Sequence, residues 1–310
     1  MYMMANTCLL WLKAGYMLHS VHRRRTMQGT QETLCFVLLI LVFVHVRAPP
    51  PARIINGEDA APGSHPHQVA LHWDRNAYYG ISGQDWRFVC GGSVIGVRVI
   101  LTAAHCVDFA PDNQFRVVIN DHVRNVDEGA EQIIGVDKII LHEQYVGGLD
   151  YTRSAYPNDI AILVLAADVG DTSTIIPLDD GSSGDRVDEK CVISGWGRND
   201  TDGDLPLTLQ EREMTVLAEF VCTLYWGSSV FAGHICVYDG SNSTTGGSAC
   251  NGDSGGPLVC GGRLAGVTSW GIDGCRLADT GEFLPSVYAR VTYYLPWIEI
   301  TLKRFTSGRG

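Results

Sequence analysis

The stretch Gly252-Asp253-Ser254-Gly255-Gly256-Pro257 stands in the C-terminal third of this 310-residue chain. Thr102-Ala103-Ala104-His105-Cys106 lies well upstream of it, and Asn158-Asp159-Ile160-Ala161 lies between the two. A histidine, an aspartate and a serine therefore follow one another in that order. Subtilisin-type enzymes carry these side chains as Asp, His, Ser, and α/β-hydrolases carry them as Ser, Asp, His, so the order excludes both folds.

The six-residue serine motif is the most specific signal in the sequence. At average residue usage, it would arise at about one start position in ten million. The other two motifs are weak when taken alone, because a lone histidine in an apolar stretch is commonly a core residue and an aspartate before an apolar run commonly marks a turn. Their joint occurrence in this order indicates a catalytic set.

Over about residues 54 to 303, the chain resembles the chymotrypsin-like (trypsin-fold) serine endopeptidases. Four further motifs carry this resemblance: Cys90-Gly91-Gly92-Ser93, Ser194-Gly195-Trp196-Gly197, Ser269-Trp270-Gly271 and Val287-Tyr288-Ala289-Arg290-Val291. The resemblance implies an all-β fold of two six-stranded antiparallel β-barrels, packed with the active site between them and followed by a C-terminal α-helix.

The composition agrees with a β-rich protein. A hydrophobic content of 45% allows a large core, and 35 glycines suit many tight turns. Short alternating runs such as residues 115 to 119 favour strands, and one helix is expected from about Tyr293 to Lys303.

The first 48 residues have the features of a leader. Leu34 to Val46 is a 13-residue apolar run, too short to span a bilayer and of the right length for a signal-peptide core. Because the region before this run is unusually long, we expect translation to begin at Met27; retention of the segment as a membrane anchor is the alternative. We predict a secreted protein with a leader (1–48), an activation peptide (49–53) and a protease domain (54–310), without stable membrane association.

The charge distribution excludes some classes of partner. Six of the 23 basic residues and one of the 34 acidic residues lie in residues 1 to 53, which leaves the remainder with a net charge of about −16. Nucleic acid and heparin are therefore not expected to bind. The family resemblance implies protein or peptide substrates, a trypsin-like activating protease and proteinaceous inhibitors as partners, and a monomer.

Eight cysteines remain when Cys8 and Cys35 are removed with the leader. Eight cysteines allow roughly a hundred pairings, so the sequence alone leaves the connectivity open. The resemblance implies the pairs Cys90 with Cys106, Cys191 with Cys260, Cys222 with Cys236, and Cys250 with Cys275. No cysteine would then remain for zinc. Two sequons, at Asn199 and Asn242, suit glycosylation of a secreted protein.

The resemblance assigns the catalytic roles. Ser254 would attack the scissile carbonyl while His105 accepts its proton, and Asp159 would hold the imidazole tautomer. The backbone N–H groups of Gly252 and Ser254 would form the oxyanion hole. No cofactor is required for this chemistry. A catalytically inactive homologue with a binding function is the rival interpretation, but all three catalytic side chains are present.

Arg53-Ile54-Ile55-Asn56-Gly57 resembles the family's zymogen cleavage site. A cut after Arg53 would free the Ile54 amine to pair with Asp253, the carboxylate next to the nucleophile. A buried carboxylate without a partner is costly, so this pair would order the loop that forms the oxyanion hole and the specificity pocket. Ile55-Asn56-Gly57 departs from the commoner Val-Gly-Gly.

The specificity pocket is expected to be neutral. Ser248 corresponds by resemblance to the pocket floor, where trypsins carry an aspartate, and Gly271 leaves the mouth open. Ser286 stands where glycine is common and would reduce the depth, while Ser269, Trp270 and Gly271 would pair with the substrate backbone. We expect a chymotrypsin-like preference for Leu, Phe, Tyr or Met over basic residues. An elastase-like or trypsin-like preference is the alternative, since the long segments His72 to Val89 and Cys275 to Pro285 flank the cleft.

Residues 121 to 131 resemble the calcium loop of trypsins and elastases. Asp121, Glu128 and Glu131 occupy ligand-bearing positions, and Val123 and Val126 would contribute carbonyl oxygens. Such hard oxygen donors suit a structural calcium ion. A solvated acidic loop is the alternative.

Overall fold

The computed structural model describes residues 54–147, 156–198, 204–239, 246–272, 275 and 283–307. They belong to a compact unit, Pro51–Gly310, and the remaining unit is Met1–Pro50. The expected leader, the activation peptide with Arg53, and the sequons at Asn199 and Asn242 lie outside the described residues. No helix among the described residues combines the length and the apolar character needed to cross a membrane.

Six antiparallel strands close into a first barrel in the order β2-β3-β4-β7-β6-β5. The strands are β2 (Gln68–Asp74), β3 (Trp86–Gly96), β4 (Val99–Thr102), β5 (Phe115–Ile119), β6 (Gln132–Leu141) and β7 (Ala161–Leu165). Pairing of β5 with β2 completes the closure. Closure leaves this sheet without an unpaired edge.

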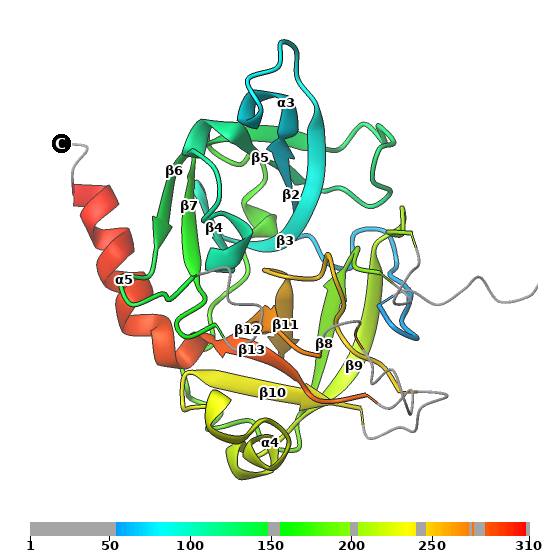
Figure 1. Cartoon of the computed structure of the whole chain (residues 1–310), viewed down its shortest axis with the longest axis vertical. Coiled ribbons are helices and arrows are strands. Elements are labelled where there is room, and N and C mark those ends of the chain that lie inside the picture. The colour runs from blue at the N-terminus through cyan, green and yellow to red at the C-terminus, as the bar shows by residue number, and fades with distance from the viewer. Residues whose placement is uncertain are drawn as a thin grey trace, which may run out of the picture. The chain divides into compact units, whose positions relative to one another are not determined.

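The second barrel follows the order β9-β10-β13-β12-β11-β8, and pairing of β8 with β9 closes it. Its strands are β8 (Lys190–Gly195), β9 (Gln210–Val216), β10 (His234–Tyr238), β11 (Pro257–Cys260), β12 (Arg263–Trp270) and β13 (Ser286–Arg290), and the short β1 (Glu58–Asp59) adds to β9. Figure 1 shows the two groups of strands. The expectation of two six-stranded antiparallel barrels is confirmed.

Helices are few. The C-terminal helix α5 (Val291–Ser307) contains the expected segment, and α3 (Arg75–Tyr78) and α4 (Glu219–Trp226) lie in connections between strands. Four single 3₁₀ turns complete the described elements: η1 (Ala104–Cys106), η2 (Asp112–Gln114), η3 (Thr172–Thr174) and η4 (Gly227–Ser229). Of these, η1 matters most for the site because it carries His105.

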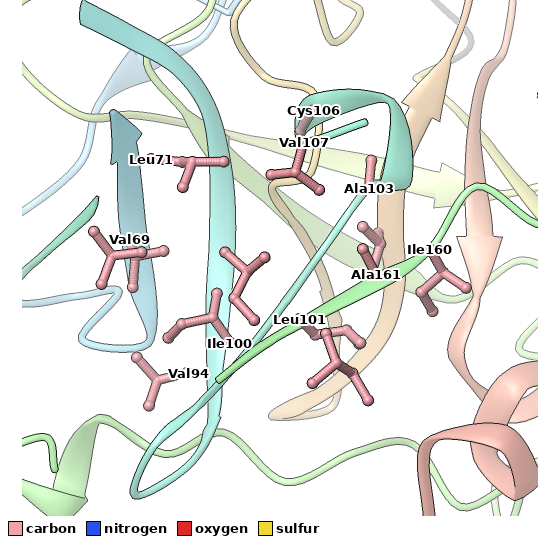
Figure 2. Close-up of a cluster of buried hydrophobic side chains, with 14 of the residues drawn as sticks. Val69, Leu71, Val94, Ile100, Leu101, Ala103, Cys106, Val107, Ile160 and Ala161 are labelled. Atoms are coloured by element: carbon pink, nitrogen blue, oxygen red, sulfur yellow. The ribbon is translucent and has the colours of Figure 1, made fainter. Parts of the chain in front are cut away.

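The largest hydrophobic cluster joins the two barrels. Figure 2 shows its first-barrel part, where Ile100, Leu101 and Ala161 pack together with Val69 and Leu71. The same cluster continues into β12, β13 and α5 through Leu264, Val267, Ala289, Val291, Tyr294 and Ile298. Burial of these side chains therefore holds the barrels against each other, which fixes any site built from both.

The structure contains the four disulfides that the resemblance implied, with Cα–Cα distances from 4.5 to 6.1 Å. Cys90–Cys106 connects β3 to the turn that carries His105. Cys250–Cys275 lies on the N-terminal side of the serine motif, and Cys191–Cys260 joins β8 to β11. The bridges thus restrain the segments around the catalytic candidates.

Candidate active site

His105 and Asp159 meet because two paired strands end beside each other. β4 pairs with β7 through Thr102 and Ala161, so η1 and the residues before β7 share one end of the sheet. The Asp159 carboxylate accepts the His105 main-chain N–H at 2.9 Å and faces Nδ1 at 2.7 Å. Two bonds to one residue fix both the position and the tautomer of the imidazole.

A third donor reaches the same carboxylate from the second barrel. Ser269, in β12, donates its hydroxyl to Asp159 Oδ2 at 2.5 Å. Asp159 is 1% exposed, so these donors replace the water that the charge has lost. Sequence reasoning placed Ser269 in the substrate-binding strand and missed this bond, which no local motif indicates.

The environment of His105 favours its protonated form. Burial of the ring works against protonation, but the Asp159 charge and hydrogen bond outweigh it and raise the pKa of His105, and Asp108 adds to the rise. Asp108 is held in turn by the Tyr145 hydroxyl at 2.9 Å. The Tyr156 ring stacks on the imidazole with a centroid distance of 5.3 Å and an interplanar angle of 23°. An imidazole with this charge environment can accept a proton from a neighbouring hydroxyl.

The serine loop packs against the first barrel. Gly91 donates its N–H to the Ser254 carbonyl at 2.8 Å, which places the loop beside the disulfide that joins Cys90 to Cys106, the last residue of η1. Gly255 has a φ of +74°, and a Cβ there would lie 2.2 Å from Thr102 Oγ1, so only glycine fits. Among the described contacts, no hydrogen bond joins the Ser254 hydroxyl to His105; such bonds commonly tighten only when substrate binds.

Two N–H groups of this loop are available to a ligand. Asp253 donates its N–H to Cys250 and Gly255 donates to Thr268. Within the described part of the chain, the N–H groups of Gly252 and Ser254 have no acceptor. Gly252 has a φ of +103°, a conformation that glycine adopts freely. These are the two donors that the sequence analysis assigned to the oxyanion hole.

Asp253 is a second buried carboxylate. It accepts the N–H groups of Gly197 at 2.8 Å and Cys250 at 2.9 Å. Burial nevertheless raises the pKa of Asp253 to about 7, against the lowering effect of these two bonds. Ile54, its expected partner after cleavage, is fully buried in the second-barrel cluster with Cys191 and Ile193.

Comparison with known proteins identifies the family. The family model named Trypsin matches residues 54–298. The chain belongs to the trypsin family. A fibrinolytic enzyme, isozyme C, of Lumbricus rubellus is 37% identical over 79% of this chain and 98% of its own. Chymotrypsin-like elastase family member 1 of Macaca fascicularis is 35% identical over 81% and 90%, respectively.

Two further likenesses agree with this family. A chymotrypsin-like serine proteinase of Haliotis rufescens is 33% identical over 86% of this chain and 99% of its own. The solved structure of neuropsin, a serine protease expressed in the limbic system of mouse brain, matches with a TM-score of 0.64 and 30% identity, over 79% of this chain and 98% of neuropsin. The protein is therefore a serine endopeptidase of the trypsin family.

In this trypsin-family enzyme, the structure brings the candidate pocket residues together. Ser248 and Ser286 are each 3% exposed, and their hydroxyl oxygens lie 3.5 Å apart. Ser286 also accepts the Ala249 N–H at 3.2 Å. A Cβ on Gly271 would meet no atom within 4 Å, which leaves space at that position. Asp279 and Glu282, two acidic residues of the long segment Cys275 to Pro285, lie outside the described residues.

The acidic side chains of the loop formed by residues 121 to 131 lie close together. Carboxylate oxygens of Asp121, Glu128 and Glu131 lie within 4.8 Å of one another. Burial raises the pKa of Asp121 to about 6; Arg124 opposes the rise, and Glu131 and Glu128 add to it. The predicted ligand carbonyl of Val123 accepts the Val126 N–H at 3.1 Å in a turn. A cation would relieve the repulsion within this group, so the residues fit calcium.

Sequence reasoning missed the residues that surround His105. Tyr145 and Tyr156 precede Asp159 in a connection without a recognisable motif, and Asp108 follows the histidine turn. The only available signal was the aromatic character of this connection, which could equally have indicated core packing.

Replacing Ser269 by alanine tests its bond to Asp159. Hydrogen bonds to charged groups contribute about 1.5–3 kcal/mol, so we expect kcat/KM to fall about ten- to hundredfold. Ser194→Ala is the matched control, because its buried hydroxyl donates to Gln68 at 2.7 Å and, among the described contacts, not to His105, Asp159 or Ser254. Steady-state kinetics on folded protein decides the matter: equal kcat/KM for both variants would contradict the assignment.

Proposed function

We propose that the protein is a secreted serine endopeptidase, made as a zymogen and activated by a cut after Arg53, with a preference for medium to large apolar residues on the acyl side of the bond. The single observation that carries the preference is the pair of buried hydroxyls, Ser248 and Ser286, at the candidate pocket. A hydroxyl is neutral and cannot offset the cost of burying a Lys or Arg charge.

The proposed reaction is acyl transfer. The Ser254 hydroxyl attacks the carbonyl carbon as His105 Nε2 takes its proton, and the oxyanion turns toward the N–H groups of Gly252 and Ser254. The imidazolium then protonates the leaving amine, and water reverses the sequence to release the acid. Asp159 stays ionised throughout, held by His105 and Ser269, and stabilises the imidazolium.

An elastase-like preference for smaller residues is the second candidate. The elastase names among the relatives favour it, as does Ser286, whose side chain takes up volume that glycine would leave free. Gly271 argues against an elastase-like preference, because the space around its Cα leaves room for a larger substrate side chain. We therefore keep Leu, Phe, Tyr and Met as the preferred residues, with Trp disfavoured.

Peptides that differ only at the acyl-side residue test this preference. A methylene in an apolar pocket contributes about 1–3 kcal/mol, so kcat/KM for Phe or Leu should exceed that for Ala roughly tenfold or more. Ser286→Gly deepens the pocket and should raise the relative rate for Trp. A higher rate for Arg or Lys would refute the neutral pocket.

The buried Asp253 carboxylate is the basis for the proposed zymogen control. Its raised pKa marks a buried carboxylate with too few donors, and an ammonium group brought to it would stabilise the ionised form. A free Ile54 amine is the group that the family resemblance assigns to this carboxylate, and Ile54 is buried in the second-barrel cluster. We propose that cleavage after Arg53 supplies it and thereby orders the serine loop.

Arg53→Gln tests this control step. The variant should be secreted but remain inactive after trypsin treatment, because no Ile54 amine is released. Active-site titration before and after trypsin, with N-terminal sequencing of the product, gives the readout. Full activity of the uncut chain would be incompatible with the proposal.

Secretion, glycosylation and partners form the rest of the proposal. Four disulfides suit an oxidising compartment, and a leader ending at residue 48 would direct the chain there. Asn199 and Asn242 would be the glycosylation sites. The activator would be a trypsin-like protease, and the partners would be protein substrates and proteinaceous inhibitors of a monomeric enzyme.

We also propose a structural calcium ion held by Asp121, Glu128, Glu131 and the carbonyls of Val123 and Val126. Asp121, Val126 and Glu131 of this loop line, together with His72 and Arg116 from β2 and β5, an open pocket of about 310 Å³. Catalysis itself would need no metal.

Calcium should stabilise the folded protein, since a ligand bound only to the native state adds about 2.7 kcal/mol at a hundredfold excess over its Kd. We expect chelation to lower Tm and to speed autolysis. Glu131→Gln should abolish the calcium-dependent Tm shift, whereas Asp137→Asn, an exposed residue on β6, should retain it. Absence of any shift in the wild type would indicate a solvated loop.

A further inference from the structure

A buried histidine of the second barrel reaches the segment before Asp159. His234 opens β10 and is 2% exposed. Its ring lies edge-on to Phe231 and to Trp270, with centroid distances of 4.4 and 5.7 Å. In such an apolar enclosure, a ring nitrogen without a partner would be costly.

Both sides of this imidazole are hydrogen-bonded. Nδ1 accepts the Phe231 N–H at 3.4 Å, and the ring forms a second bond with the main chain of Tyr156. Because Nδ1 acts as an acceptor, the neutral ring carries its proton on Nε2, and this N–H donates to the Tyr156 carbonyl. Burial lowers the pKa of His234 to about 4, so the ring is neutral at neutral pH.

Tyr156 connects this histidine to the catalytic candidates. Its ring stacks on His105 and also packs against the cluster that contains Trp270 and Val230. Asn158, two residues on, is held through its side chain by the Tyr294 hydroxyl at 3.3 Å. Asp159 then receives its donors from His105 and Ser269. Contacts with other elements thus hold the short segment from Tyr156 to Asp159 along its length.

We propose that His234 is a positioning residue of the active site, which fixes the main chain of Tyr156 and thereby the ring that stacks on His105. The inference rests on the proposed role of His105 as general base. Asp159 restrains the imidazole at Nδ1 and the Tyr156 ring restrains one face, so Nε2 keeps one direction. Without the donor at 234, the Tyr156 carbonyl loses this bond and the ring can shift.

Two substitutions at the same position separate positioning from packing. His234→Leu removes both hydrogen bonds, whereas His234→Gln retains an amide donor and a carbonyl acceptor. We expect His234→Leu to lower kcat and the rate of fluorophosphonate labelling about tenfold or more, and His234→Gln to recover most of the loss. The acid limb of the plot of kcat/KM against pH reports the pKa of His105. This limb should shift in His234→Leu and lie close to its wild-type position in His234→Gln.

His67→Leu is the matched control. His67 is also buried, at 7% exposure, and burial lowers its pKa to about 4, but it lies in the first barrel before β2. Because its Nε2 has no hydrogen-bond partner within the described part of the chain, this variant removes a buried imidazole without removing a bond at that atom, and it should keep its labelling rate. An unchanged labelling rate and kcat in folded His234→Leu, or a loss that Gln does not reduce, would overturn the proposal.

A double-mutant cycle with Tyr156→Ala tests the route of the effect. If His234 acts through the Tyr156 ring, His234→Leu should have little further effect on kcat in the Tyr156→Ala background; additive losses would refute the route. If His234→Leu does not fold, His234→Asn, whose amide is one methylene shorter than that of Gln, takes its place. Ser254→Ala serves as a separate check: its loss of labelling establishes the catalytic serine whatever the outcome at His234.

Discussion

The arrangement of the active site depends on the hydrogen bonds that the buried Asp159 carboxylate accepts. A charge at 1% exposure is stable only when donors replace its hydration. The donors come from both barrels: the main chain and ring of His105 from the first, and the Ser269 hydroxyl from the second. The carboxylate is therefore fully hydrogen-bonded only when the barrels are packed together, so the position of the imidazole and the packing of the barrels are maintained by the same contacts.

The buried carboxylate of Asp253, unlike that of Asp159, has too few hydrogen-bond donors to stabilise its charge. It has two main-chain donors, but burial still raises the pKa of its carboxyl to about 7. The space around it is confined, because a Cβ on Gly195 or Gly197 would lie 2.2 Å from its carboxylate oxygens. No bulkier neighbour could therefore be accommodated at those two positions, and a small cationic group is the kind of partner that would stabilise the charge. The protein thus contains one satisfied and one incompletely satisfied buried carboxylate beside its candidate catalytic residues.

The sequence predicted those features that short motifs determine. The order of His105, Asp159 and Ser254, the glycines around the serine and the resemblance to a known family were sufficient for the two barrels and the four disulfide pairs. The contacts of Ser269 with Asp159 and of His234 with Tyr156 were not predictable, because they join residues about 80 to 110 positions apart on different barrels. Such contacts depend on how the barrels pack, and neither residue type nor local periodicity reports that packing.

The segment from Ser248 to Asp253 shows why activation and specificity would change together. Two consecutive main-chain N–H groups bond to residues with different proposed roles. Ala249 donates to Ser286 at the pocket, and Cys250 donates to the Asp253 carboxylate. Gly252, whose N–H has no acceptor among the described residues, lies in the same six residues. A shift of the Asp253 carboxylate would therefore move the pocket wall and the oxyanion donors at once, while the β-strands on either side could stay in place. Control of this kind requires rearrangement of one short loop rather than of a barrel, which is compatible with the disulfide Cys250–Cys275 that anchors the middle of the loop.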